Sequence, residues 1–454
     1  MISKQTRLPQ KMRGILFACF CIGSAFAAGD SLVWNQFDTK VKIDAGQIVN
    51  GFYVRSVELQ PMNRNTVVLS QSASYGDWNF SAGFEGILWW PFGAADLGLP
   101  PEQRTVRVEP RLAQAKAKVN FVPADQDYVE VGFFPYKYNP DAKNLGEYLY
   151  RSGTYPGVVQ TTDGLHLLDH AAYDAYGAHF HASLLNGLLG QELNFFIEPN
   201  VVPTGDITLG YEVAVSTRLF QIGAGVAYNR LISFAPSRNH PHAATDNDNR
   251  YIEVDSGGKA IFKGPYSAAP FAMQQKYLNG GDSVYSVTHS YYTQRGIKLM
   301  ARASLDLGFL VPGEMRGNGD LRIFTEAAIL GLEDQPYYYD RIWQRIPVMA
   351  GVNIPTGRTL DLLSIQMEYY KSRFNNDELY IVSGYPVWNV DRYNRDDWKW
   401  SFYAEKTLGR LFKIHAQVAS DHLRLPDFTT NLSHTDITLK PNNWYYLIRL
   451  EFGG

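Results

Sequence analysis

The feature that most constrains this chain is an alternation of apolar and polar residues with a period of two, which recurs along most of its length. Between residues 206 and 216, one set of alternate positions holds Ile207, Leu209, Tyr211, Val213 and Val215. The intervening positions hold Asp206, Thr208, Gly210, Glu212, Ala214 and Ser216. Successive side chains of a β-strand point to opposite faces, so this pattern predicts strands with one apolar and one polar face.

Such alternation predicts an all-β chain of about sixteen strands, an even number as bacterial single-chain barrels require. The expected strands lie near 48–60, 66–75, 77–90, 105–122, 127–136, 177–187, 191–199, 206–216, 218–231, 286–308, 319–331, 341–353, 359–371, 397–407, 410–422 and 441–452. Many run for about 10 to 13 residues, enough for a tilted strand to cross a bilayer. Strands of soluble sheets are usually about five or six residues long.

The connections between these strands sort by length. Every second connection is short, and 309–318 is the longest of that set. The connections longer than it all fall in the other set, at 91–104, 137–176, 232–285, 374–395 and 423–440. Outer-membrane barrels have short turns on the periplasmic side and long loops outside. The sorting therefore favours a transmembrane antiparallel β-barrel with long extracellular loops over a soluble sandwich.

The N-terminus is typical of an exported protein. Lys4, Arg7, Lys11 and Arg13 precede an apolar run from 14 to 27, which ends in an A-x-A cleavage pattern. We expect a signal peptide at 1–27, a short periplasmic segment at 28–46 and the outer-membrane barrel at 47–454. The run is too short to span a bilayer, and no apolar run of 18 residues follows it.

The cysteine content and the net charge of the chain limit its disulfide bonds and its binding partners. Both cysteines, Cys19 and Cys21, lie in the leader, so the mature chain has no disulfide. The leader holds four of the 42 basic residues and none of the 45 acidic ones, which leaves 38 minus 45, or −7. A chain of this charge is not expected to bind nucleic acid.

The last strand must find a neighbour for its open edge, and the first strand of the same chain would close a barrel. One face of it carries Trp444, Tyr446, Ile448, Leu450 and Phe452. The other face carries Tyr445, Leu447, Arg449 and Glu451. This strand is similar to the signal that the barrel-assembly machinery reads.

With its leader, strands, loops and aromatic last strand, the chain resembles bacterial outer-membrane porins at the level of architecture. The resemblance implies a Gram-negative cell outer membrane and a transport channel for passive diffusion of small hydrophilic solutes. Such passive diffusion needs no cofactor. Expected partners are outer-membrane lipid or lipopolysaccharide, the assembly machinery and, since barrels of this size often trimerise, two further copies. Alternatives are a structural or adhesive outer-membrane protein and a soluble exported sandwich that binds glycans.

Charged residues on the polar faces are candidates for pore lining, because a charge facing lipid costs ~2–4 kcal/mol at mid-membrane. Mixed rings of charge tune ion selectivity in channels. Lumenal ion pairs that merely stiffen the wall are the alternative role. The candidates are Lys116, Lys118, Glu130, His181, Glu192, Glu212, Lys298, Arg302, Glu326, Lys413 and Arg449.

His181, Ser183 and the later Asn194 resemble the His-x-Ser and Asn of outer-membrane phospholipase A. That resemblance would make His181 the base, Ser183 the nucleophile and Asn194 the group that orients the imidazole. These residues lie on the polar face, however, away from lipid. We therefore expect pore lining rather than an enzyme, and the barrel-borne lipid hydrolase is kept as an alternative.

His179 and His181, two residues apart, face the same side of their strand, and Glu192 lies opposite. Such residues can ligate a metal. Paired histidines in a polar lumen are more often solvated or hydrogen-bonded, so we expect no metal.

The connection 137–176 is rich in tyrosine, including Tyr138, Tyr148 and Tyr150. Folded inward, it would narrow the pore, and its rings could stack on sugars. An ordinary packed surface loop has the same composition.

Overall fold

The computed structural model describes most of the strands and the shorter connections. The described residues are 32–35, 37–50, 60–61, 64–89, 107–121, 127–150, 173–198, 206–232, 252–254, 260–262, 271–277, 283–289, 296–313, 317, 319–332, 342–370, 398–420 and 443–453. The expected signal peptide at 1–27 lies outside them, as does most of each long connection.

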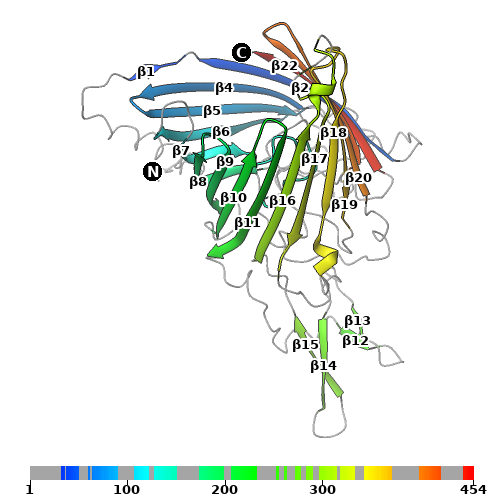
Figure 1. Ribbon diagram of the computed structural model, residues 1–454. Helices are drawn as coiled ribbons and strands as arrows, with labels where there is room; N and C mark the ends of the chain where they lie inside the picture. The colour runs from blue at the N-terminus through cyan, green and yellow to red at the C-terminus, as the bar shows by residue number, and fades with distance from the viewer. Residues whose placement is uncertain are drawn as a thin grey trace, which may run out of the picture.

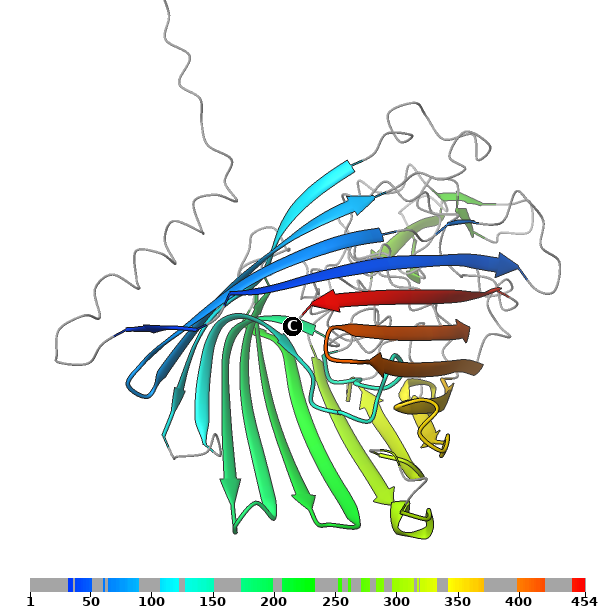
Figure 2. The same ribbon diagram turned by 90° about the horizontal axis from the view of Figure 1, so that it is seen from above.

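Sixteen antiparallel strands form a closed barrel, as the alternation predicts (Figures 1 and 2). In chain order they are β2 (Asp38–Asn50), β4 (Arg64–Tyr75), β5 (Trp78–Trp89), β6 (Arg107–Asn120), β7 (Tyr128–Tyr136), β8 (Tyr173–Leu184), β9 (Leu189–Glu198), β10 (Asp206–Ser216), β11 (Phe220–Ile232), β16 (Gly296–Asp306), β17 (Arg322–Leu330), β18 (Val348–Asn353), β19 (Leu362–Tyr369), β20 (Trp398–Leu408), β21 (Phe412–Ser420) and β22 (Asn443–Gly453). Each strand pairs with the next, and β22 pairs with β2 from Lys40↔Gly453 to Asn50↔Asn443. Figure 2 shows red β22 beside blue β2, where the ring closes.

Smaller elements complete the described chain. β1 (Val33–Trp34) pairs with β4, and β3 (Gln60–Pro61) pairs with β2. Two separate hairpins, β12 (Ile252–Val254) with β13 (Ala260–Phe262) and β14 (Phe271–Tyr277) with β15 (Ser283–His289), belong to the connection between β11 and β16. Short 3-10 helices, η3 (Gly308–Leu310) and η4 (Ile342–Arg345), flank β17 in sequence. Within the described ranges, no helix has the length and apolarity that a membrane span needs.

Three expected strands differ from those observed. The first lies at 38–50 rather than 48–60, because Val41, Ile43 and Ala45 supply its outward face and its pairing with β22 selects that register. The barrel thus begins before residue 47, and residues 38–46 belong to its wall. The strand expected at 286–308 begins only at Gly296, since Ser283–His289 pairs in a hairpin instead. The strand expected at 341–353 is shortened by η4.

Apolar side chains cover the outside of the wall, whereas polar ones are buried inside. Interior positions include fully buried Asn194, Glu326 and Gln366. Exposed large apolar residues alternate with such positions, at Ile43, Val67, Leu69, Phe84, Val131, Phe180, Leu193, Phe195, Leu209, Ile222, Val226, Leu305, Ile323, Val348, Met367, Phe402 and Ile448. A water-soluble protein buries most of its apolar side chains and exposes its charges, so the distribution of polarity in this wall is largely the inverse of that pattern.

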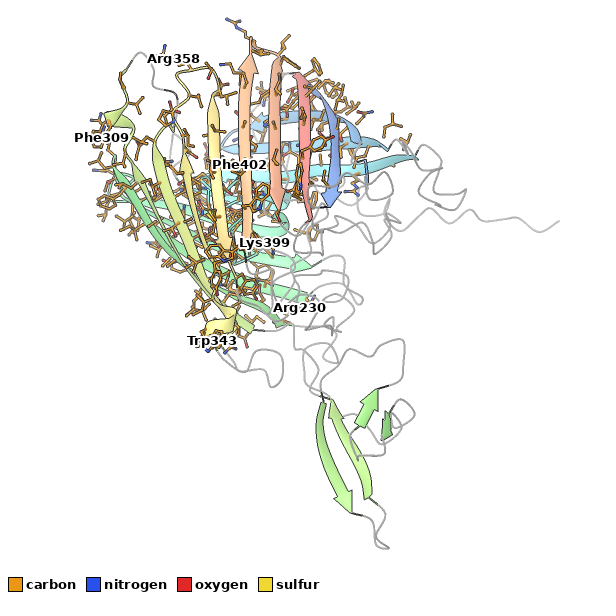
Figure 3. The ribbon with its side chains drawn as sticks, turned by 90° about the vertical axis from the view of Figure 1, so that its right-hand side faces the viewer. Arg230, Phe309, Trp343, Arg358, Lys399 and Phe402 are labelled. Carbon is orange, nitrogen blue, oxygen red and sulfur yellow. The ribbon has the colours of Figure 1, made fainter. Side chains whose placement is uncertain are left out.

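The two ends of the barrel carry different connections. Figure 3 shows Phe309 and Arg358 at one end, on the connections that follow β16 and β18. Arg230 and Trp343 lie toward the other end, where β11 ends and β18 begins. Successive connections therefore lie at opposite ends, as in any antiparallel barrel, and most of each long connection expected from the sequence lies outside the described residues.

Candidate functional site

Residues 137–150, here called the inner segment, follow β7 and fold into the barrel. Eleven of these fourteen residues are buried, and only Lys137, Pro140 and Lys143 are not. Gly146 and Glu147 have φ values of 85° and 56°, which turns the chain back on itself. The carboxylate of Glu147 accepts the N–H of Asn139 at 2.9 Å and closes the turn. A packed surface loop would leave one side in water, so the inward fold is the one observed.

Glu326 of β17 is the main anchor of the inner segment. Its Oε1 accepts the hydroxyl of Tyr138 at 2.6 Å and the backbone N–H of Tyr148 at 2.9 Å. Its Oε2 accepts the side-chain amide of Asn139 at 2.6 Å. Hydrogen bonds to an ionised acceptor are stronger than neutral ones, and all these groups are buried.

The inner segment reaches the wall opposite its origin. Counted from β2, β7 is the fifth strand and β19 the thirteenth, which is eight strands away in either direction. On β19, Gln366 accepts the N–H of Leu145 at 3.3 Å, and Glu368 accepts the hydroxyl of Tyr148 at 2.9 Å. Arg322 of β17 pairs with Asp141 at 2.9 Å. These contacts hold the inner segment across the interior.

Two glycines in the wall make room for the inner segment. A Cβ atom at Gly210 would overlap the hydroxyl of Tyr150. On the neighbouring strand β11, a Cβ atom at Gly225 would lie 2.7 Å from Cδ1 of Leu149. Because glycine has no side chain, these two positions leave the space into which Tyr150 and Leu149 of the inner segment pack.

A polar cluster joins the inner segment to β9 and β10. Glu192 and Glu212 lie directly opposite each other in these strands. The hydroxyl of Tyr136 is within hydrogen-bonding distance of both carboxylates, at 2.5 and 3.0 Å. Asn194 donates to the hydroxyls of Tyr136 and Tyr150, at 2.8 and 3.1 Å. The cluster bridges two carboxylates that would otherwise repel each other across the strands.

None of the eleven residues expected to line the pore is exposed on the outer surface. In the wall, Lys116 pairs with Glu130 at 2.8 Å, and Lys118 lies 4.0 Å from the ring centre of Tyr128. Arg302 donates to Gln221 at 3.2 Å. Other partners are Glu405 for Lys413 at 2.7 Å, Asp44 for Arg449 at 2.6 Å, and the carbonyl of Tyr148 for Lys298 at 3.2 Å.

His181, Glu192, Glu212 and Glu326 gather around the inner segment or beside it. Of the other seven candidates, Lys298 also contacts the inner segment. The remaining six are spread around the wall. Gln366 and Glu368 already lay on the polar face of the strand expected at 359–371, and Tyr136 directly preceded the tyrosine-rich connection. Neither signal predicted that Gln366 and Glu368 would hold the inner segment, because that contact joins residues far apart in sequence.

The groups of the hydrolase alternative do not assemble. In the register, His179 lies opposite Asn194, whereas His181 lies opposite Glu192. Asn194 donates to Tyr136, Tyr150 and Glu212, and no hydrogen bond joins it to His181 among the described contacts. The backbone N–H of Ser183 donates to Asp127 at 2.6 Å. The base and its orienting amide are therefore not paired.

Comparison with known proteins gives likeness of fold alone. No family model and no curated protein matches the chain. It is similar to a mutant of Rh. blastica porin, with 10% sequence identity and a TM-score of 0.42 over 93% of this chain and 100% of that one. It is also similar to Salmonella typhi OmpF in complex with daunomycin, with 9% identity and a TM-score of 0.45 over 92% and 98%. Such distant matches transfer no residue's role. The closed barrel of the structure itself agrees with the expected barrel architecture.

Proposed function

We propose that this chain is a porin-like channel of the outer membrane, through which small hydrophilic solutes diffuse passively. The single observation that carries the proposal is the inverted distribution of polarity in a closed barrel. Apolar side chains cover its outside, and its inside carries charged and amide groups around a buried cluster of aromatic and apolar side chains that includes the inner segment. Lipid would contact the first set and water the second.

The inner segment sets the width of the proposed channel. It crosses from β7 to β19 and is held by charge-assisted hydrogen bonds rather than by apolar packing alone. Solutes would pass beside it, between its polar edge and the charged wall. Ion pairs such as Lys116 with Glu130 leave both signs of charge in the wall, and such mixed charge keeps water in a channel.

The proposed setting follows from the same architecture. The leader would direct export, and the last strand would engage the barrel-assembly machinery. Lipopolysaccharide or other outer-membrane lipid would contact the apolar belt. Two further copies of the chain are the proposed partners in a homotrimer.

Conductance in a planar bilayer tests the proposal. The purified protein should give stable conductance steps in salt solution. A variant in which residues 140–147 are replaced by a short Gly-Ser linker should give larger steps, because the obstruction across the interior is removed. Replacement of the exposed turn 185–188 by the same linker is the matched control and should leave the steps unchanged.

Folding of each variant is checked by heat-dependent migration in gels, so that a misassembled barrel is not scored as a closed channel. Absence of conductance from a folded wild-type barrel at every voltage would refute the channel and leave only the barrel. Release of the protein from membranes by carbonate would refute the membrane location itself.

A further inference from the structure

A second site lies in the wall beside the inner segment, where β8 and β9 bring three metal-ligating side chains together. His179 and His181 share the inner face of β8, and Glu192 of β9 pairs directly with His181. Nε2 of His179 lies 3.7 Å from Oε2 of Glu192, and Nδ1 of His181 lies 3.7 Å from Oε1. One ligand atom of each residue lies within 4.8 Å of the others. Ligands about 2.0–2.2 Å from a tetrahedral ion are about 3.3–3.6 Å apart, so small side-chain rotations would close the site.

One ring nitrogen of His179 has no hydrogen-bond partner among the described residues. The residue as a whole is 6% exposed, and the Nε2 atom of its ring is buried. Leaving a buried polar atom unsatisfied costs about 1–3 kcal/mol. The same atom points toward the carboxylate of Glu192, beyond hydrogen-bonding distance. A cation between the two groups would satisfy both.

Neighbouring groups hold the three side chains in place. The ring of Tyr128 stacks on His181 with centroids 5.2 Å apart and meets the edge of His179 at 5.5 Å. Tyr136 donates its hydroxyl to Glu192. Hydrogen bonds to a ligating carboxylate and fixed imidazole orientations are the usual support of metal sites. The site is built on two hydrogen-bonded strands, so its geometry does not depend on a loop.

We propose that His179, His181 and Glu192 bind a divalent transition-metal ion such as Zn²⁺, although the sequence favoured a solvated histidine pair. Two imidazoles and one carboxylate suit Zn²⁺, Ni²⁺ or Cu²⁺, whereas Ca²⁺ and Mg²⁺ prefer oxygen ligands alone. Three protein ligands leave a coordination position open toward the interior. The ion would therefore sit where water or a passing solute can complete its shell.

A second interior histidine provides a matched control. His415 on β21 also lies between two carboxylates, 3.6 Å from Glu405 and 3.9 Å from Glu451. These carboxylates approach opposite ring nitrogens, Nδ1 and Nε2, so one ion cannot reach both together with the imidazole. Nδ1 of His415 also lies 2.8 Å from the hydroxyl of Tyr403. His415 therefore shares the charge and burial of the proposed site but not its ligand geometry.

The experiment is calorimetric titration of Zn²⁺ into the folded full-length protein in detergent, prepared without a histidine tag. We expect a tight event with one ion per chain that excess Ca²⁺ or Mg²⁺ does not displace. His181→Gln and Glu192→Gln should each weaken that event at least about tenfold. His415→Gln should leave it unchanged. So should a double substitution by Gln of His240 and His242, two further histidines in the connection 232–285 of the sequence. Titration of Co²⁺ gives an independent readout, since its visible absorption reports imidazole and carboxylate coordination.

Absence of binding to the folded wild-type protein overturns the proposal. Binding that survives both site substitutions overturns it as well, as does binding that the His415 or loop variant abolishes. Heat-dependent migration in gels verifies that each variant is folded. The titration does not depend on transport, so its failure and failure of the conductance experiment are separate results.

Discussion

Arg449 of β22 forms a two-point ion pair with Asp44 of β2 across the seam that closes the barrel. Nε of Arg449 lies 2.6 Å from Oδ1, and Nη2 lies 2.8 Å from Oδ2. The two residues are direct partners in the strand register, and Asp44 is only 5% exposed. The first and last strands of the chain are thus joined by side chains as well as by the backbone.

Asp44→Asn should weaken the seam. Removal of one partner of a buried pair leaves an uncompensated charge and typically costs about 3–5 kcal/mol. Unfolding by urea in detergent, followed by tryptophan fluorescence, measures the loss. Asp38→Asn on the same strand is the control, because its pair with Lys40 is exposed and 4.0 Å long. Equal stability of the two variants would show that the seam pair contributes nothing special.

Gly210→Ala should destabilise the packed inner segment by about 1–3 kcal/mol, because the new Cβ atom overlaps the Tyr150 hydroxyl. Tyr150→Leu in the same chain should recover part of the loss. Gly86→Ala is the control, since a Cβ there meets nothing within 4 Å. Urea unfolding reports stability, and protease sensitivity of the inner segment reports its release. Equal stability of Gly210→Ala and Gly86→Ala would show that Tyr150 does not need the space at Gly210.

Glu326→Gln should loosen the inner segment without removing it. A glutamine keeps one acceptor oxygen but presents an NH₂ group to a donor of Tyr138, Asn139 or Tyr148, at a cost of about 1–3 kcal/mol. We expect noisier single-channel currents than those of the wild type. Glu130→Gln, which alters a pair within the wall, should leave the noise unchanged. Quiet currents from the Glu326 variant would contradict the role of this anchor.

Leu193→Arg tests whether lipid contacts the outer face. Leu193 is an exposed residue near the middle of β9. An arginine facing the bilayer midplane costs ~2–4 kcal/mol, falling to about 0–1 kcal/mol near the interfaces. Phe121→Arg, just beyond the end of β6, should therefore be much better tolerated. Urea titration of each variant refolded into lipid vesicles measures its free energy of unfolding, which Leu193→Arg should lower more than Phe121→Arg. Equal losses of stability in the two variants would argue against a membrane around this face.

Asp361, on the turn before β19, should make stability depend on pH. Burial would raise the pKa of Asp361, but hydrogen bonds from Thr407 and Lys406 outweigh it and lower the pKa below its ordinary value of 3.8. Its stabilisation is therefore present above pH 3.8 and is lost as the pH falls through the lowered pKa. Asp361→Asn should be less stable than the wild type at pH 7, and the difference should disappear in acid. A difference that persists at low pH would contradict this assignment.

The sequence determined the wall. Alternation such as that of Asp206–Ser216 was sufficient because a strand has only two faces, and the lipid and the interior select opposite polarities. It placed most strands within a few residues of their observed bounds. It misplaced the first strand, because both 38–50 and 48–60 carry apolar residues and the choice depends on pairing with β22, which is remote in sequence.

Only the tertiary structure decided the interior. The inner segment has no periodicity that tells an inward path from a surface one, and its path is fixed by Glu326, Gln366 and Glu368, almost two hundred residues or more away. The approach of His179 to Glu192 likewise depends on the register of β8 against β9, whereas spacing alone gives only a shared face. Local sequence determines which face of a strand a side chain occupies. Pairing between strands that are remote in sequence determines which residues that side chain contacts.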